Sequence, residues 1–147
     1  MKPFDILVNE KKFQYDAPNI SGEGLLILVG LPHSLDYEIL FKLNHKEFEP
    51  IQLDEIVDLT NPEIETFLIK PLPSTTIEVD DERYPIAQIF MTPKEILVLA
   101  GIKADNHYLK QIQEHKEITY KNDMDYTIAI VNKMKFVSCK LSSTTVS

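Results

Sequence analysis

The chain has 147 residues and a formal net charge of -8, from 15 Lys and Arg against 23 Asp and Glu. An acidic chain without a basic stripe lacks the phosphate contacts that supply most non-specific affinity for nucleic acid, so we expect no nucleic-acid partner. The single cysteine, Cys139, excludes an internal disulfide and fits a reducing compartment.

No apolar run in the sequence approaches the length of a membrane span. The first residues, Met1-Lys2-Pro3-Phe4-Asp5, lack the apolar region of a signal peptide. An apolar fraction of 44% is normal for a globular protein and too high for a disordered one. We therefore expect a soluble, cytoplasmic protein with no membrane partner.

The first half of the sequence recurs in the second half at a distance of about 71 residues. The matched segments are Ile6-x-Val8-Asn9 with Ile77-x-Val79-Asp80, Phe13 with Tyr84, Ser21 with Thr92, 25–30 with 96–101, and Phe67 with Phe136. Because solenoid repeats are shorter, a repeat of this length indicates two similar domains in tandem. We expect residues 1–71 to form the first domain and residues 72–147 the second.

Each half opens with apolar residues that alternate on both sides of a polar turn, which is the pattern of a β-hairpin. The turns are residues 9–12 in the first half and residues 80–83 in the second. Further alternating or apolar segments predict strands later in each half. These segments are 37–43, 66–69, 108–112, 126–131 and 136–141.

A helix start follows each predicted hairpin. Thr92-Pro93-Lys94-Glu95 is a capping box with Pro at the first helical position, whereas Ser21 offers a cap without the box. The apolar runs that follow end at Gly30 and Gly101, where glycine suits a left-handed helix cap. Their β-branched residues make a strand the competing interpretation. The caps favour helices over about 21–29 and 92–100.

A hairpin, one helix and two or three more strands make a compact α+β domain of about 70 residues. The segment Pro71-Leu72-Pro73-Ser74 is predicted to be a short, semi-rigid linker between the halves, because proline restricts the backbone. The predicted core of the two domains is Ile6, Val8, Leu25, Leu28, Phe67, Ile77, Val79, Ile96, Leu97, Leu99, Ile128 and Phe136.

This order of elements resembles the β-grasp of ubiquitin, and the repeated motif resembles the bacterial multi-ubiquitin domain family. The motif is Ile-x-Val-Asn/Asp, an aromatic residue four positions later, then Ser/Thr and Leu/Ile-Leu-x-Leu-x-Gly. The stretch from Thr92 to Gly101 is the nearest match. The resemblance covers each half once and implies two tandem ubiquitin-like β-grasp domains.

Members of this family resemble the modifier of bacterial ubiquitin-like conjugation operons, some of which act against phage. Those operons also encode proteins that resemble a ubiquitin-activating enzyme, a ubiquitin-conjugating enzyme and a deubiquitinase-like metalloprotease. The resemblance therefore implies a protein modifier whose C-terminal carboxylate is adenylated and passed to targets, with these three proteins as partners. The sequence itself has no nucleophile–base constellation and, with four glycines, no phosphate-binding Gly-rich loop, so we expect no catalytic residue, metal or cofactor in the chain.

The resemblance also implies that the C-terminal tail is the conjugation site. The tail residues are Leu141, Ser142, Ser143, Thr144, Thr145, Val146 and Ser147. Ubiquitin-type modifiers end in Gly-Gly, whereas the last glycine in this sequence is Gly101. Three explanations stay open: the enzymes accept a small terminal residue such as Ser147, the native tail is not fully represented, or the protein is never conjugated. In the last case, the protein is a non-covalent adaptor that binds its partner through a sheet face.

Other candidate sites have simpler interpretations. Cys139 falls in a predicted strand without an adjacent His, so a half-buried structural cysteine is expected. The acid pairs Asp54-Glu55 and Asp80-Asp81 lie in polar turns and are expected to be solvated. The four histidines lack the spacing of a zinc site and are also expected in solvated turns. They are His33, His45, His107 and His115.

Positive charge gathers near the C-terminal end of this acidic chain. Residues 1–71 hold 6 Lys and 13 acids, a net charge of -7, whereas residues 72–147 hold 9 Lys or Arg and 10 acids, a net charge of -1. Lys133, Lys135 and Lys140 lie near the tail. They could steer docking on an acidic partner or form an ordinary solvated strand face.

Overall fold

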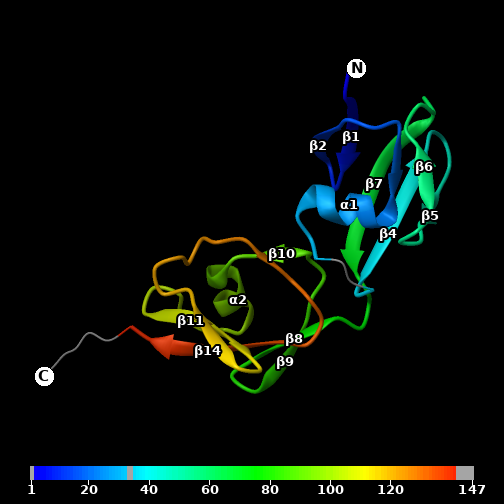
Figure 1. Ribbon diagram of the computed structural model, residues 1–147. Coiled ribbons are helices and arrows are strands. Elements are labelled where there is room, and N and C mark those ends of the chain that lie inside the picture. Colours follow the sequence, from blue (N-terminus) through cyan, green and yellow to red (C-terminus); the bar gives the residue numbers. More distant parts are fainter. Residues whose placement is uncertain (1, 33–34, 142–147) are drawn as a thin grey trace, which may run out of the picture. The chain divides into compact units, whose positions relative to one another are not determined.

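The computed structural model describes residues 2–32 and 35–141 of the chain. The chain divides into two compact units, Met1–Leu72 (unit 1) and Pro73–Ser147 (unit 2). Each unit contains one helix and one five-stranded mixed sheet (Figure 1). Neither helix in the described part of the chain has the length and apolar character needed to cross a bilayer.

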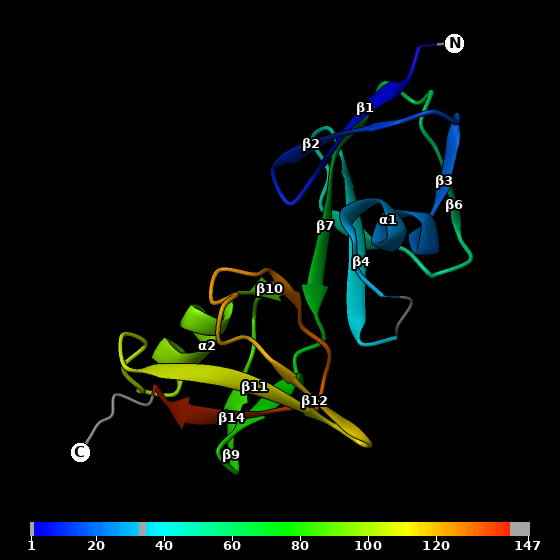
Figure 2. The ribbon, with the colours of Figure 1, turned by 60° about the vertical axis from the view of Figure 1, so that its left-hand side comes forward.

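Unit 1 builds its sheet in the order β2-β1-β7-β4-β5, with β1 and β7 parallel at the centre and the other neighbours antiparallel. The short strands β3 and β6 form a separate pair, and Figure 2 shows α1 beside it. The elements are β1 (Phe4–Val8), β2 (Lys11–Tyr15), β3 (Asn19–Ser21), α1 (Gly22–Val29), β4 (Tyr37–Leu43), β5 (Phe48–Pro50), β6 (Ile56–Asp58) and β7 (Ile64–Pro71).

Unit 2 repeats this arrangement, with the sheet order β9-β8-β14-β11-β12 and the small pair β10 and β13. Strands β8 and β14 are the parallel pair. The elements are β8 (Thr76–Val79), β9 (Glu82–Pro85), β10 (Phe90–Met91), α2 (Pro93–Leu99), β11 (His107–Gln113), β12 (Lys116–Thr119), β13 (Ile128–Ala129) and β14 (Met134–Lys140).

The hairpin at the start of each unit has a two-residue turn, shorter than the four-residue turns that the sequence predicts. Asn9 and Glu10 have φ values of 52° and 66°, and Asp80 and Asp81 have values of 50° and 67°. Two successive residues at positive φ are the requirement of a type I′ turn, whose twist matches that of the flanking strands. Asn and Asp tolerate this conformation better than other residues with a side chain.

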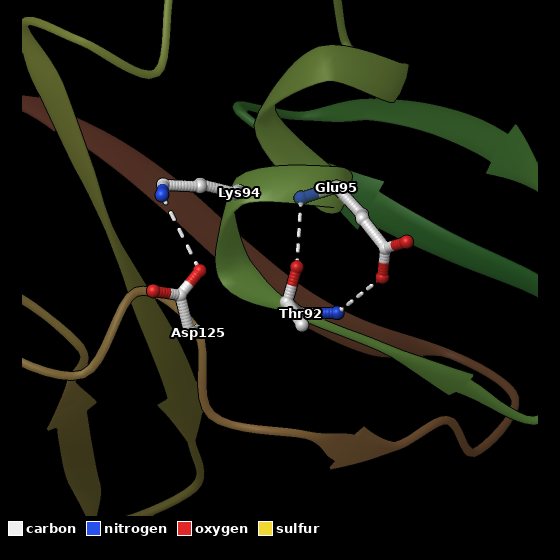
Figure 3. A network of polar contacts seen from close by, with 4 residues as sticks. All are labelled: Thr92, Lys94, Glu95 and Asp125. Carbon is white, nitrogen blue, oxygen red and sulfur yellow. Dashed lines mark hydrogen bonds and ion pairs between the residues drawn. The ribbon is translucent and has the colours of Figure 1, made fainter.

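Both predicted helices are present, and their caps explain where they begin. The Ser21 hydroxyl accepts a hydrogen bond from the Gly24 N–H at 3.0 Å. In α2, the Thr92 hydroxyl accepts from the Glu95 N–H at 3.2 Å, and the Glu95 carboxylate accepts from the Thr92 N–H at 2.8 Å (Figure 3). The capping box predicted for α2 is therefore confirmed, and so is the simpler cap of α1.

The later strands differ from the prediction mainly in length. Segment 37–43 matches β4, whereas 66–69 is the middle of the longer β7, which includes Pro71. Segment 126–131 contains only the two-residue β13. The strands that the sequence did not predict are β3, β5, β6, β10 and β12. Each has two to four residues, too few for a period-two pattern to stand out.

Ten of the twelve predicted core residues are buried, and the two exceptions are on the helices. Leu28 is only partly buried, and Leu99 is 38% exposed. Adjacent helical positions differ by about 100°, so an apolar run that continues around the helix cannot all face one sheet. The buried apolar positions are Leu25 and Leu26 in α1, and Ile96 and Leu97 in α2. The apolar pattern alone does not distinguish these positions from their more exposed neighbours on the same helix.

Candidate functional site

The predicted conjugation tail begins where the central strand β14 ends. Leu141 is 37% exposed, and its N–H donates a hydrogen bond to the Asn106 carbonyl at 2.9 Å. Strand β14 is paired on both sides, with β8 and with β11, so the start of the tail is held by the middle of the sheet. The remaining tail residues, Ser142, Ser143, Thr144, Thr145, Val146 and Ser147, lie outside the described residues.

Cys139 lies in β14, partly buried, as predicted. Its cross-strand neighbour is Tyr108 in β11, and the Lys121 ammonium lies 5.6 Å from the centre of the Tyr108 ring. Cys139 therefore lies within a paired part of the sheet, and its place in the strand accounts for its partial burial.

The histidines in the described residues lie apart from one another. His45 is in the turn between β4 and β5, and His115 is in a turn and contacts Glu114 at 3.0 Å. His107 is instead the partly buried first residue of β11 and contacts the Lys103 carbonyl at 3.0 Å, so the prediction of a solvated turn is wrong for His107. His33 lies outside the described residues. Among residues 2–32 and 35–141, no three His, Cys, Asp or Glu side chains gather in a way that could hold a metal ion.

The acid pairs have local structural roles that the sequence did not reveal. The Glu55 carboxylate accepts a hydrogen bond from the Gln52 N–H at 3.1 Å, which closes a turn. Asp80 reaches across to β14, where its carboxylate accepts from the N–H of Ser138 at 2.9 Å and from its hydroxyl at 2.6 Å. The prediction of a merely solvated Asp80 is therefore incomplete, because this exposed carboxylate joins a hairpin turn to the last strand.

Unit 1 carries apolar side chains on the face of its sheet that is opposite the core. We call this set the apolar stripe: Leu7, Leu40, Phe48, Pro50 and Leu68. Leu40 is the cross-strand neighbour of both Leu68 and Pro50. Leu7 is 40% exposed and Phe48 is 42% exposed. The stripe therefore crosses four strands and presents partly exposed apolar surface at both ends.

The corresponding positions of unit 2 are mostly polar. Strand register aligns the apolar stripe of unit 1 with Glu78, Lys110, Glu117, Thr119 and Val137. Two ion pairs cross this face, Lys110–Glu117 at 3.4 Å and Lys135–Glu78 at 3.7 Å. The Lys110 ammonium donates a hydrogen bond to the Glu117 carboxylate, which raises the pKa of Lys110. The aligned positions are thus apolar in unit 1 and mostly polar in unit 2.

The sheet order, the parallel central pair and the single helix fit a ubiquitin-like β-grasp fold. The family model described as Multiubiquitin matches residues 4–71, so unit 1 carries a domain of the multiubiquitin family. The predicted resemblance to this family is confirmed over those residues. The match falls on the first half, whereas the sequence motif predicts the nearer match in the second half. Domains of this family are in general non-enzymatic protein modules.

No curated protein matches the chain, and no solved structure matches it.

Proposed function

We propose that this chain is a tandem ubiquitin-like protein modifier of a bacterial conjugation pathway, acting in the cytoplasm. The observation that carries the proposal is the multiubiquitin match over residues 4–71. The second unit repeats the order of strands and helix found in the first, which supports a second β-grasp domain. A role in defence against phage is part of the proposal.

In this mechanism the chain supplies the reacting carboxylate and the recognition surfaces, and its partners supply the catalysis. An activating-type enzyme adenylates the C-terminal carboxylate and releases pyrophosphate from ATP. The carboxyl group then passes to a thiol of a conjugating-type enzyme with release of AMP, and finally to an amine of the target. A deubiquitinase-like metalloprotease hydrolyses the resulting amide. Leu141 directly follows β14, and its N–H is bonded to the Asn106 carbonyl, so the first residue of the proposed tail is held beside the sheet.

The test is to follow the protein in its native host with the neighbouring genes intact. Denaturing gels and intact mass spectrometry should reveal heavier species joined through the terminal carboxylate, and they should identify the terminal residue. A variant without residues 142–147 should keep the fold and lose every adduct. A single unconjugated species under phage challenge would contradict the proposal.

A second candidate function is a non-covalent adaptor, which the apolar stripe favours. Apolar surface that is bounded by polar residues often marks a protein-binding face. The substitution Leu7→Glu introduces the charge that unit 2 carries at the same position, Glu78. For an adaptor, Leu7→Glu should abolish capture of the partner, whereas removal of residues 142–147 should leave capture unchanged. The reverse pattern would identify the modifier.

A further inference from the structure

Unit 2 has a cavity of about 460 Å³ at the start of β8 and β14, apart from the tail. Its lining residues are Thr76, Ile77, Glu78, Arg83, Lys133 and Lys135. Three of these side chains are cationic and one is anionic, so the cavity has an excess of two positive charges. Such an excess is unusual in a chain whose net charge is -8.

The strand register arranges the cations around the single carboxylate. Arg83 in β9 and Lys135 in β14 are both cross-strand neighbours of Glu78 in β8. The Lys135 ammonium lies 3.7 Å from the Glu78 carboxylate. The side chain of Glu78 is 25% exposed and that of Lys135 is 59% exposed. One of the cations is therefore neutralised by Glu78, which leaves Arg83 and Lys133 to attract an external anion.

Lys133 is held in position by a turn that is bonded to β8. Its N–H donates to the Thr76 carbonyl at 2.8 Å, and the Asn132 side-chain oxygen accepts from the Thr76 N–H at 3.0 Å. Lys133 has a φ of 70°, in the left-handed region that favours glycine or asparagine. The turn that carries this cation is therefore bonded to both the N–H and the carbonyl of Thr76, and it holds Lys133 in a conformation that a lysine rarely adopts.

The cavity at the corresponding end of the sheet in unit 1 has an acidic lining. The cavity there measures about 300 Å³, and its lining residues include Asp5 and Glu65 but no lysine or arginine. The turn before β7 carries Glu63 where the turn before β14 carries Lys133, as the matching turn hydrogen bonds show. By strand register Lys12 corresponds to Arg83, so the units differ in the turn residue, Glu63 against Lys133, and in the acidic residues that line the cavity of unit 1. The fold therefore does not require a basic cavity.

We propose that the basic cavity of unit 2 binds an acidic peptide segment of a partner protein through its carboxylates. Arg83 offers a planar fork of donors that suits a carboxylate, and Lys133 offers a second positive charge beside Thr76. Glu78 in the centre repels a compact dianion, whereas separate carboxylates along a peptide can pair with Arg83 and Lys133 on either side of it. This site goes beyond the proposed function, because it operates equally in a modifier and in an adaptor.

The experiment is an NMR titration of the full chain with a capped hexapeptide of alternating Asp and Glu, at low and at physiological salt. The neutral control peptide alternates Asn and Gln. Saturable shifts at Thr76, Glu78, Arg83 and Lys133 are expected with the acidic peptide alone, and added salt should weaken them because exposed charges are screened. Equal shifts with the neutral peptide, or no saturable shift at low salt, would overturn the proposal.

Two matched double variants separate the cavity from the overall charge. Arg83→Gln with Lys133→Gln should weaken binding of the acidic peptide by about fivefold or more, as expected for the loss of two exposed ion pairs. Lys103→Gln with Lys116→Gln removes the same charge from exposed residues of unit 2 outside the cavity, and it should leave affinity within about twofold. Equal losses in both double variants would show non-specific attraction and overturn the site.

A third variant and a competitor complete the test. Lys133→Gly removes the cation and relieves the positive φ, so it should weaken binding without loss of stability. Unchanged binding by this folded variant would contradict the role of Lys133. Inorganic phosphate should displace the acidic peptide poorly, because Glu78 opposes a compact dianion. Displacement by phosphate at concentrations below those of the acidic peptide would overturn the assignment of carboxylate as the ligand.

Discussion

Asn9 and Asp80 occupy the Asn/Asp position of the Ile-x-Val-Asn/Asp segment, and each joins a hairpin turn to the final strand of its unit. The Asn9 side chain accepts from the Ile69 N–H at 2.7 Å and donates to the Ile69 carbonyl at 2.9 Å. Asp80 cannot donate, and its partner Ser138 supplies a hydroxyl donor instead. Both residues also adopt the positive φ that the turn requires. Asn9 in one half and Asp80 in the other therefore have the same role: each forms the turn and bonds it to the final strand.

We expect Asp80→Ala to destabilise unit 2 by about 1 kcal/mol more than Asp81→Ala, measured by urea unfolding. Both positions have positive φ, so alanine strains both turns similarly. Only the Asp80 substitution removes the acceptor of Ser138, and a hydrogen bond of this kind contributes on the order of 1 kcal/mol. Equal destabilisation by the two variants would show that the link to β14 adds no stability.

Tyr37 is expected to make the unfolding free energy of unit 1 fall as the pH rises in the alkaline range. Burial, and then the neighbouring Asp36, raise the pKa of the Tyr37 phenol from 10.0 to about 12. Because the folded state holds this proton more tightly, the associated stability is present below pH 10 and is lost as the pH rises to about 12. In Tyr37→Phe, the unfolding free energy of unit 1 should fall less over this interval. Residue-resolved urea titrations at each pH measure the unfolding free energy of unit 1, with Tyr15→Phe as the control. Identical pH profiles for the wild type and Tyr37→Phe would refute the role of Tyr37.

At the scale of elements, the ends of the two helices depend on local residues, whereas their packing depends on residues far away in the sequence. Each helix begins where a hydroxyl caps it, and each is followed by a glycine at positive φ, 87° for Gly30 and 75° for Gly101. Gly22 has a further role, because a Cβ there would lie 2.4 Å from the Gln52 carbonyl oxygen. The sequence predicted the ends of the helices, but the close approach at Gly22 involves a loop about thirty residues away.

We expect Thr92→Ala to destabilise unit 2 by about 1 kcal/mol, because it removes the acceptor for the first turn of α2. Glu95→Gln is the control, because glutamine can also accept the Thr92 N–H and so preserves the capping box. Thermal or urea unfolding followed by signals of unit 2 measures both. A loss for Glu95→Gln as large as that for Thr92→Ala would indicate that charge at the helix start matters more than the box.

The chain divides into two compact units, and each contains buried apolar side chains of its own. Phe67 is 1% exposed in the core of unit 1, where its ring lies 6.4 Å from that of Phe41. Phe136 is 2% exposed in the core of unit 2. Strand β7 continues through Pro71 and β8 begins at Thr76, so the connection is residues 72–75, one residue later than the predicted linker and of the same length. The units share a sheet order, but they differ in the apolar stripe and in the basic cavity.

We expect Phe67→Ala to destabilise unit 1 by about 3–5 kcal/mol and to leave unit 2 folded, because removal of a buried ring creates a cavity in one core alone. An NMR urea titration resolves the two units through their own signals. Phe136→Ala is the matched control and should produce the opposite pattern. Simultaneous unfolding of both units in either variant would show that the two cores fold cooperatively.

The sequence by itself determined the features that depend on neighbouring residues: the hairpins, the helix caps, the tandem repeat and the α+β class. Tertiary structure alone decided which helical residues are buried, where short strands such as β5 and β12 pair, and what Asp80 contacts. It also decided the candidate surfaces, since Arg83 and Lys133 are fifty residues apart in the sequence and line one cavity because β8 pairs with both β9 and β14. Caps and turns are local interactions that a residue pattern encodes directly, whereas strand pairing and burial depend on partners that only the folded chain brings together.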